Sequence, residues 1–182
     1  MANSPNMRES IEIVFPAERI AEQIEALALQ IRDLQFDNLL VIAILKGSFV
    51  FAADLIRALY RAGLAPEVDF LSLSSYRKGT KSLGHVEILR DIEADVRGRN
   101  VLIVDDILES GRTLAFAKDL IAARAAARVS TCVLLDKPVP RSVGITADLA
   151  AFQCPDVFVV GYGMDLAHRF RELPFVGRLI DR

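Results

Sequence analysis

Cysteine, histidine and long apolar runs are scarce in this sequence, and each scarcity excludes a class of protein. The two cysteines, Cys132 and Cys154, lack a metal-binding spacing, and the two histidines, His85 and His168, lie far apart. We therefore expect neither a disulfide nor a His/Cys metal site. A metal, if one is used, should be a hard ion held through oxygen.

Apolar runs such as LLVIAIL at 39–45 are far shorter than the roughly 20 residues that span a bilayer. The first residues, MANSPNMRESIE, lack the apolar region of a signal peptide. The 22 basic and 24 acidic residues give a net charge of −2, so no overall positive field attracts nucleic acid or an anionic membrane. These features predict a cytoplasmic protein with neither a nucleic-acid nor a membrane partner.

The 182 residues, 52% of them hydrophobic, suit a single domain spanning residues 1–182. Residues 16–34, 48–63 and 113–127 have helical patterns, with Pro16 and Gly63 at helix ends. Apolar runs predict strands at 39–45, 68–75, 86–90, 101–106, 129–135 and 157–163. This alternation predicts an α/β fold with a mainly parallel central sheet flanked by helices, from which residues 137–182 form an irregular excursion.

The stretch VLIVDDILESGRTL at 101–114 places two acids where a buried strand ends. Ligands of open α/β sheets bind at the carboxyl ends of strands, so Asp105 and Asp106 are candidate binding residues. The alternative is a solvated strand end whose acids cap a helix. The sequence of the pair alone does not separate these readings.

The loop after the pair favours binding of a phosphorylated ligand. Gly111 lets backbone amides approach a ligand, and residues 110–113 add two hydroxyls and a helix N-terminus. Carboxylates beside a phosphate cradle suit a sugar phosphate, because they accept hydrogen bonds from vicinal ribose hydroxyls. The alternative is an ordinary helix cap made by Ser110 or Thr113.

VLIVDDILESGRTL resembles the phosphoribosyl pyrophosphate (PRPP) motif of type I phosphoribosyltransferases, and its surroundings resemble the hypoxanthine-guanine branch from about residue 10 to 180. The resemblance implies transfer of a phosphoribosyl group from PRPP to N9 of a 6-oxopurine, with Mg²⁺ as cofactor. It also implies a small hood made by the N- and C-terminal segments, a mobile flap, and a homodimer or homotetramer.

Further segments carry this resemblance. LKGS at 45–48 is similar to the pyrophosphate loop, which implies a cis Leu45–Lys46 peptide bond, and SSYRKGTKSLGHV at 74–86 is similar to the flap. The PRPP-binding residues that the resemblance implies are Leu45, Lys46, Gly47, Ser75, Tyr76, Asp105, Asp106, Ser110, Gly111, Arg112, Thr113 and Arg171.

The purine-binding residues come from two C-terminal segments. LLDKPVPRSVG supplies Lys137 for the exocyclic oxygen of the purine, and DVFVVGYGMD supplies Phe158, Val159 and Asp165. Phe158 would stack on the base, and the Val159 backbone would hydrogen-bond it. Asp165, Asp105 and Asp106 are the implied Mg²⁺ ligands. Taken singly, most of these residues would be ordinary core or solvated positions.

Glu109 departs from the family, which usually has aspartate here as the base or proton partner at purine N7. Glutamate has the same carboxyl group as aspartate, but its side chain is longer by one methylene and has one more rotatable bond. A misplacement of about 1 Å can cost roughly 100-fold in rate. We expect a working enzyme with Glu109 as its catalytic residue, although low activity or a shifted base preference also fits the sequence.

Other functions stay open on the sequence alone. A uracil phosphoribosyltransferase that regulates pyrimidine genes by binding RNA would carry a similar PRPP motif, and Glu109 leaves room for a non-catalytic PRPP or nucleotide sensor. A receiver domain would place its acid pair after the first strand, whereas that strand here ends before Lys46. No G-x-x-x-x-G-K-[ST] or G-x-G-x-x-G motif is present. The preference among hypoxanthine, guanine and xanthine is not encoded in any of these motifs.

Overall fold

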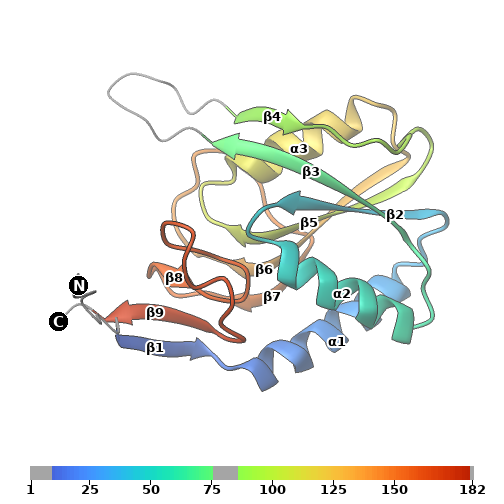
Figure 1. Cartoon of the computed structure of the whole chain (residues 1–182). Coiled ribbons are helices and arrows are strands. Elements are labelled where there is room, and N and C mark those ends of the chain that lie inside the picture. The colour runs from blue at the N-terminus through green and yellow to red at the C-terminus, as the bar shows by residue number, and fades with distance from the viewer. Residues whose placement is uncertain (1–9, 76–85, 181–182) are drawn as a thin grey trace, which may run out of the picture.

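A computed structural model of the protein describes residues 10–75 and 86–180 and contains two β-sheets (Figure 1). The larger sheet has six strands in the order β4-β3-β2-β5-β6-β7, and the smaller has three in the order β1-β9-β8. The elements are β1 (Ser10–Phe15), α1 (Ala17–Asp33), β2 (Leu39–Leu45), α2 (Phe49–Arg61), β3 (Glu67–Ser75), β4 (Val86–Arg90), β5 (Asn100–Leu108), α3 (Arg112–Ala122), β6 (Arg128–Asp136), β7 (Leu149–Gln153), β8 (Val159–Val160) and β9 (Val176–Ile180).

The large sheet is parallel except at one edge, where β4 runs antiparallel to β3. Alternate side chains of β2 fill the two halves of the core. Val41 and Ala43 pack with α1 and α2 on one face, while Leu40, Ile42 and Ile44 pack with α3 on the other. A strand covered by helices on both faces needs a continuous apolar run, which explains LLVIAIL. The predicted α/β class with a mainly parallel sheet is confirmed.

The helices begin close to where the sequence predicts them. α1 follows Pro16, and α2 ends just before Gly63, whose φ is 88°. The prediction that the third helix continues to residue 127 is wrong, because α3 ends at Ala122. Ala125 has a φ of 62°, and its carbonyl accepts a hydrogen bond from Gly98, which turns the chain into β6.

The small sheet joins the two ends of the described chain. β1 pairs antiparallel with β9, with Ser10 opposite Ile180, and β8 pairs with the other edge of β9. A strand was expected over 157–163, but only Val159 and Val160 form one, because Gly161, Tyr162 and Gly163 all have positive φ. Strands β1, β7 and β9 were not predicted.

The parallel strands β2, β5 and β6 end at the same edge of the large sheet, as Figure 1 shows. Loops after Leu45, Leu108 and Asp136 therefore gather there. The expected flap, residues 76–85 including Tyr76, lies outside the described residues. The single-domain boundary at 1–182 stays a prediction. No described helix is long and apolar enough to cross a membrane.

Candidate active site

A cleft of about 600 Å³ opens where the parallel strands end. Ten of the predicted catalytic and binding residues line it: Leu45, Lys46, Gly47, Asp106, Glu109, Lys137, Phe158, Val159, Asp165 and Arg171. They come from four separate parts of the chain, which the sheet brings together. The cleft therefore brings together side chains that the sequence analysis could assign to a site only segment by segment.

Asp105 and Asp106 differ in exposure although they are adjacent in β5. Asp105 is only 6% exposed, whereas Asp106 is partly exposed and lines the cleft. Burial raises the pKa of Asp105 well above its ordinary value, and the neighbouring charge of Asp106 raises it further. Burial also raises the pKa of Asp106, while Arg171 opposes that shift. The pair therefore favours a ligand that donates hydrogen bonds or carries positive charge.

The loop after β2 approaches this acid pair closely. The Leu45–Lys46 peptide bond is cis, as the resemblance implies. Gly47 lies so near Asp106 that an added Cβ would stand 1.8 Å from its Oδ2 atom. Lys46 is exposed and lines the cleft. Backbone and ammonium donors of this loop thus face the same space as the carboxylates.

Glu109 and Lys137 form an ion pair inside the cleft. Lys137 is only 4% exposed, and its Nζ donates a hydrogen bond to Glu109 Oε1 at 3.1 Å. The Lys137 amide also donates to the Leu108 carbonyl at 3.0 Å. The chain after β6 is therefore held to the chain after β5 by a backbone bond and a side-chain bond.

Residues 110–113 lead into α3, and they are not among the described residues that line the cleft. Gly111 is the N-cap, with a φ of 79°, and a Cβ there would meet Ile145 at 2.7 Å, so glycine is required. The Ser110 hydroxyl accepts only a long, 3.4 Å bond from the Arg112 amide. The first-turn amides of α3, including that of Thr113, remain a suitable place for a phosphate.

The C-terminal residues complete the cleft. Phe158 is 56% exposed and presents an open ring beside buried Val159 of β8. Asp165 is ion-paired with Arg171 at 2.7 Å, and its other oxygen accepts a bond from the His168 amide. Arg171 also donates to the Gly163 carbonyl, so the loop is fastened at both ends.

Some lining residues were not predicted. They are Ser72, Leu73, Ser74, Leu89, Ile107, Met164 and His168. Met164 lies within the DVFVVGYGMD segment, and His168 precedes Arg171 by three residues, so both stand close to residues that the sequence does indicate. Ser74 is the first residue of the flap-like segment at 74–86, so it could also have been found from that segment. Ser72, Leu73 and Leu89 belong to β3 and β4, where no local signal marks them. The side chain of the expected Ser75 is not among those described.

The donor set fits Mg²⁺. Asp105, Asp106 and Asp165 offer carboxylate oxygens, which this ion prefers, and Asp106 and Asp165 line the same cleft. In the described part of the chain, no three His, Cys, Asp or Glu side chains converge on one point. Mg²⁺ is usually held by one or two carboxylates together with water and substrate phosphates, so such a cluster is not required.

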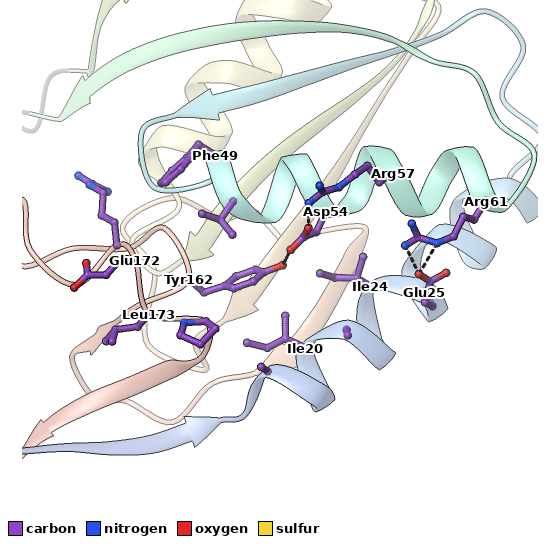
Figure 2. A pocket seen from close by; sticks show the side chains of 15 residues that line it. Ile20, Ile24, Glu25, Phe49, Asp54, Arg57, Arg61, Tyr162, Glu172 and Leu173 are labelled. Atoms are coloured by element: carbon purple, nitrogen blue, oxygen red, sulfur yellow. Dashed lines mark hydrogen bonds and ion pairs between the residues drawn. The ribbon is translucent and has the colours of Figure 1, made fainter.

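A larger cavity, of about 930 Å³, lies outside this cleft between α1, α2 and residues 171–174 (Figure 2). Four of its charged groups are paired with one another: Arg61 contacts Glu25, and Asp54 contacts both Arg57 and the Tyr162 hydroxyl. Arg171 lines both this cavity and the cleft. Neither Asp106 nor the Glu109–Lys137 pair lines it. Size alone therefore does not identify the site, and the chemistry lies in the smaller cleft.

Comparison with known proteins agrees with this geometry. The phosphoribosyl transferase domain family matches residues 10–167. Hypoxanthine phosphoribosyltransferase of Escherichia coli K12 is 39% identical over 177 residues, covering 96% of this chain and 98% of that protein. A crystal structure of a hypoxanthine-guanine phosphoribosyltransferase from Bacillus anthracis is 44% identical, with a TM-score of 0.86 over 94% of this chain and all (100%) of that one.

A structure of the Trypanosoma cruzi hypoxanthine phosphoribosyltransferase in complex with its product IMP is also similar. It is 34% identical, with a TM-score of 0.87 over 98% of each chain. The family match covers most of this chain, and these relatives align along nearly their whole lengths. The cleft, the fold that builds it and the comparisons together place this chain in the phosphoribosyltransferase family.

Proposed function

We propose that the protein is a purine salvage enzyme that transfers the phosphoribosyl group of PRPP to N9 of hypoxanthine or guanine. The products would be IMP or GMP and pyrophosphate. The observation that carries this proposal is the convergence of an acid pair, the Glu109–Lys137 pair and the open Phe158 ring in one cleft. The named relatives support the purine assignment and give no support to the uracil alternative.

The sugar phosphate end of the substrate would lie over β5 and α3. Asp105 and Asp106 would accept hydrogen bonds from the ribose hydroxyls, directly or through water. The backbone amides of residues 110–113 would hold the 5′-phosphate at the α3 N-terminus. Because those contacts come from the backbone, the side chains of Ser110, Arg112 and Thr113 would matter less than the conformation of Gly111.

The purine would lie between Phe158 and the Glu109–Lys137 pair. Phe158 would stack on its face, and the Val159 backbone would hydrogen-bond its edge. Lys137 would donate to the exocyclic oxygen. Glu109 would act at N7, taking or sharing a proton as N9 bonds to the sugar, and a positioned acid or base of this kind is typically worth ~10² to 10⁴ in rate.

The pyrophosphate end would lie against the loop after β2. Leu45, Lys46 and Gly47 present ammonium and backbone donors there, and Arg171 adds a guanidinium. Donors aimed at charge that develops in the transition state lower its energy. When bound to Asp165 or to the acid pair, Mg²⁺ would neutralise charge on the departing pyrophosphate.

The test is an ultraviolet assay of the purified chain with PRPP, Mg²⁺ and each of hypoxanthine, guanine, xanthine, adenine and uracil, with products identified by chromatography. We expect IMP and GMP. Product from uracil alone would reassign the protein to pyrimidine chemistry. Binding of PRPP without product from any base would favour a sensor. The homodimer or homotetramer and the cytoplasmic location stay predictions.

A further inference from the structure

We propose that Lys137 is a positioning residue for Glu109, fixing the longer carboxylate side chain where the family usually has aspartate. The inference rests on the proposed function, and it assigns Lys137 a second task besides contact with the purine oxygen. Its starting point is the ion pair at 3.1 Å between Lys137 Nζ and Glu109 Oε1.

The two side chains have very different surroundings. The side chain of Lys137 is 5% exposed, so its ammonium is held in place by the protein, whereas that of Glu109 is 41% exposed. An exposed glutamate samples several rotamers, and fixing such a side chain costs conformational entropy. A charge-assisted bond to a buried, immobile ammonium selects one position for the carboxylate. The buried partner therefore orders the exposed one.

The backbone makes the ammonium a fixed reference point. The Lys137 amide bonds the Leu108 carbonyl at 3.0 Å, and the neighbouring residues Leu108 and Asp136 are paired across β5 and β6. Arg141 forms an ion pair with Asp136 and braces the same turn. The backbone of Lys137 is thus hydrogen-bonded to Leu108, the residue that directly precedes Glu109.

The geometry of a 6-oxopurine matches this arrangement. Its O6 and N7 atoms lie side by side on one edge. A lysine ammonium has three donors, so Lys137 can bond Glu109 and still donate to O6. An ammonium that bridges the two would hold the carboxylate beside N7. The extra methylene of Glu109 then serves to reach Lys137, and Glu109→Asp would break the pair without movement of the backbone.

The experiment is a double-mutant cycle in the full chain, with PRPP, Mg²⁺ and hypoxanthine. The variants are Glu109→Gln, Lys137→Met, the two combined, and Glu109→Asp, with Lys118→Met as the matched control. Lys118 lies on α3 and faces Asp148 at 3.7 Å, outside the cleft. Circular dichroism and PRPP binding confirm that each variant is folded.

We expect Glu109→Gln and Lys137→Met each to lower kcat by about 10². The double variant should be no more than about threefold slower than the slower single variant, because residues that act as a unit are not additive. Glu109→Asp should lower kcat rather than raise it, and Lys118→Met should leave activity unchanged. A decrease in kcat on Lys137→Met supports the positioning role. If Lys137 only contacted the purine oxygen, its replacement would mainly raise the KM for the base.

Three results would overturn the inference while leaving the enzyme active: multiplicative losses in the double variant, a Lys137→Met defect confined to KM, or faster turnover by Glu109→Asp. Failure of the unchanged chain to form nucleotide is a different result. It would overturn the proposed function, and the inference with it.

Discussion

Gly47 is the residue at which the cleft has least room for added atoms. Its Cα faces Asp106 so closely that a methyl group would overlap the carboxylate. Its carbonyl oxygen in turn lies 2.4 Å from where a Cβ on Gly163 would stand. Absence of a side chain at both glycines thus lets the loop after β2, the acid pair and the C-terminal loop meet.

Replacing Gly47 by alanine should damage PRPP binding more than stability. The Asp106 carboxylate would have to move by an amount near 1 Å, a displacement that can cost about 100-fold in rate. We expect kcat/KM for PRPP to fall by about 10- to 100-fold, with little change in the unfolding midpoint. Gly144→Ala is the matched control, because an added Cβ there meets nothing within 4 Å. Equal kinetics for both variants would contradict this role.

Phe158 should contribute to binding of the base and not of PRPP. Stacking of a base on an aromatic ring is worth about 1–3 kcal/mol, or roughly 5- to 150-fold. Phe158→Ala should raise the KM for hypoxanthine by that factor and leave the KM for PRPP unchanged. Phe70→Ala serves as the control, since Phe70 is similarly exposed, at 44%, on β3 outside the cleft. An increase confined to PRPP would place the base elsewhere.

At the scale of elements, β6 contains a buried thiol that links stability to pH. Burial raises the pKa of Cys132 to about 12. Below about pH 8.5 the thiol is protonated in both the folded and the unfolded chain, so its contribution to stability is intact. As the pH rises further the unfolded chain ionises first, and the contribution is lost progressively until the pH reaches the folded pKa.

The free energy of unfolding should therefore fall above about pH 8.5, with up to about 1.4 kcal/mol per pH unit due to this thiol. Urea unfolding between about pH 7 and 10.5 measures the slope, with reductant present. Cys132→Ala, although less stable throughout, should show a shallower decline. Parallel curves for the two proteins would mean that the thiol titrates alike in both states.

The elements that the sequence predicts best are those whose own residues determine them. The continuous apolar runs LLVIAIL and VLIVDD predict strands that are buried on both faces, because helices cover each side of the sheet. The apolar residues of α1 recur at helical spacing, so they predict a helix with one buried face. Strands β1 and β9 escape prediction because each exists through pairing with a segment at the other end of the chain. Local pattern contains no information about such a partner.

The same distinction applies to the cleft. The adjacent acids and Gly111 could be identified from one continuous motif. The Glu109–Lys137 contact could not, since it depends on the register in which β5 and β6 are paired. Ser72 and Leu89 line the cleft because β3 pairs with β2 and β4 pairs with β3, and neither pairing can be read from the local sequence.

For the whole molecule, ligand binding should appear as increased thermal stability. A ligand present at 100 times its Kd stabilises the folded state by about 2.7 kcal/mol. For a chain of this size that corresponds to an increase in Tm of about 5–10 °C. We expect PRPP with Mg²⁺ to give this shift in differential scanning fluorimetry, and PRPP with EDTA to give much less. Equal shifts in the two conditions would show that Mg²⁺ is not needed for binding.

The pairing of β1 with β9 also determines how the molecule would respond to mechanical force. Ser10 and Ile180 are opposite each other, and β1 and β9 lie side by side in Figure 1. A pull on both ends would load the antiparallel hydrogen bonds one after another, beginning with the outermost pair, instead of all at once. The small sheet would unzip at low force, while the six-stranded sheet with its buried acids remained folded behind it.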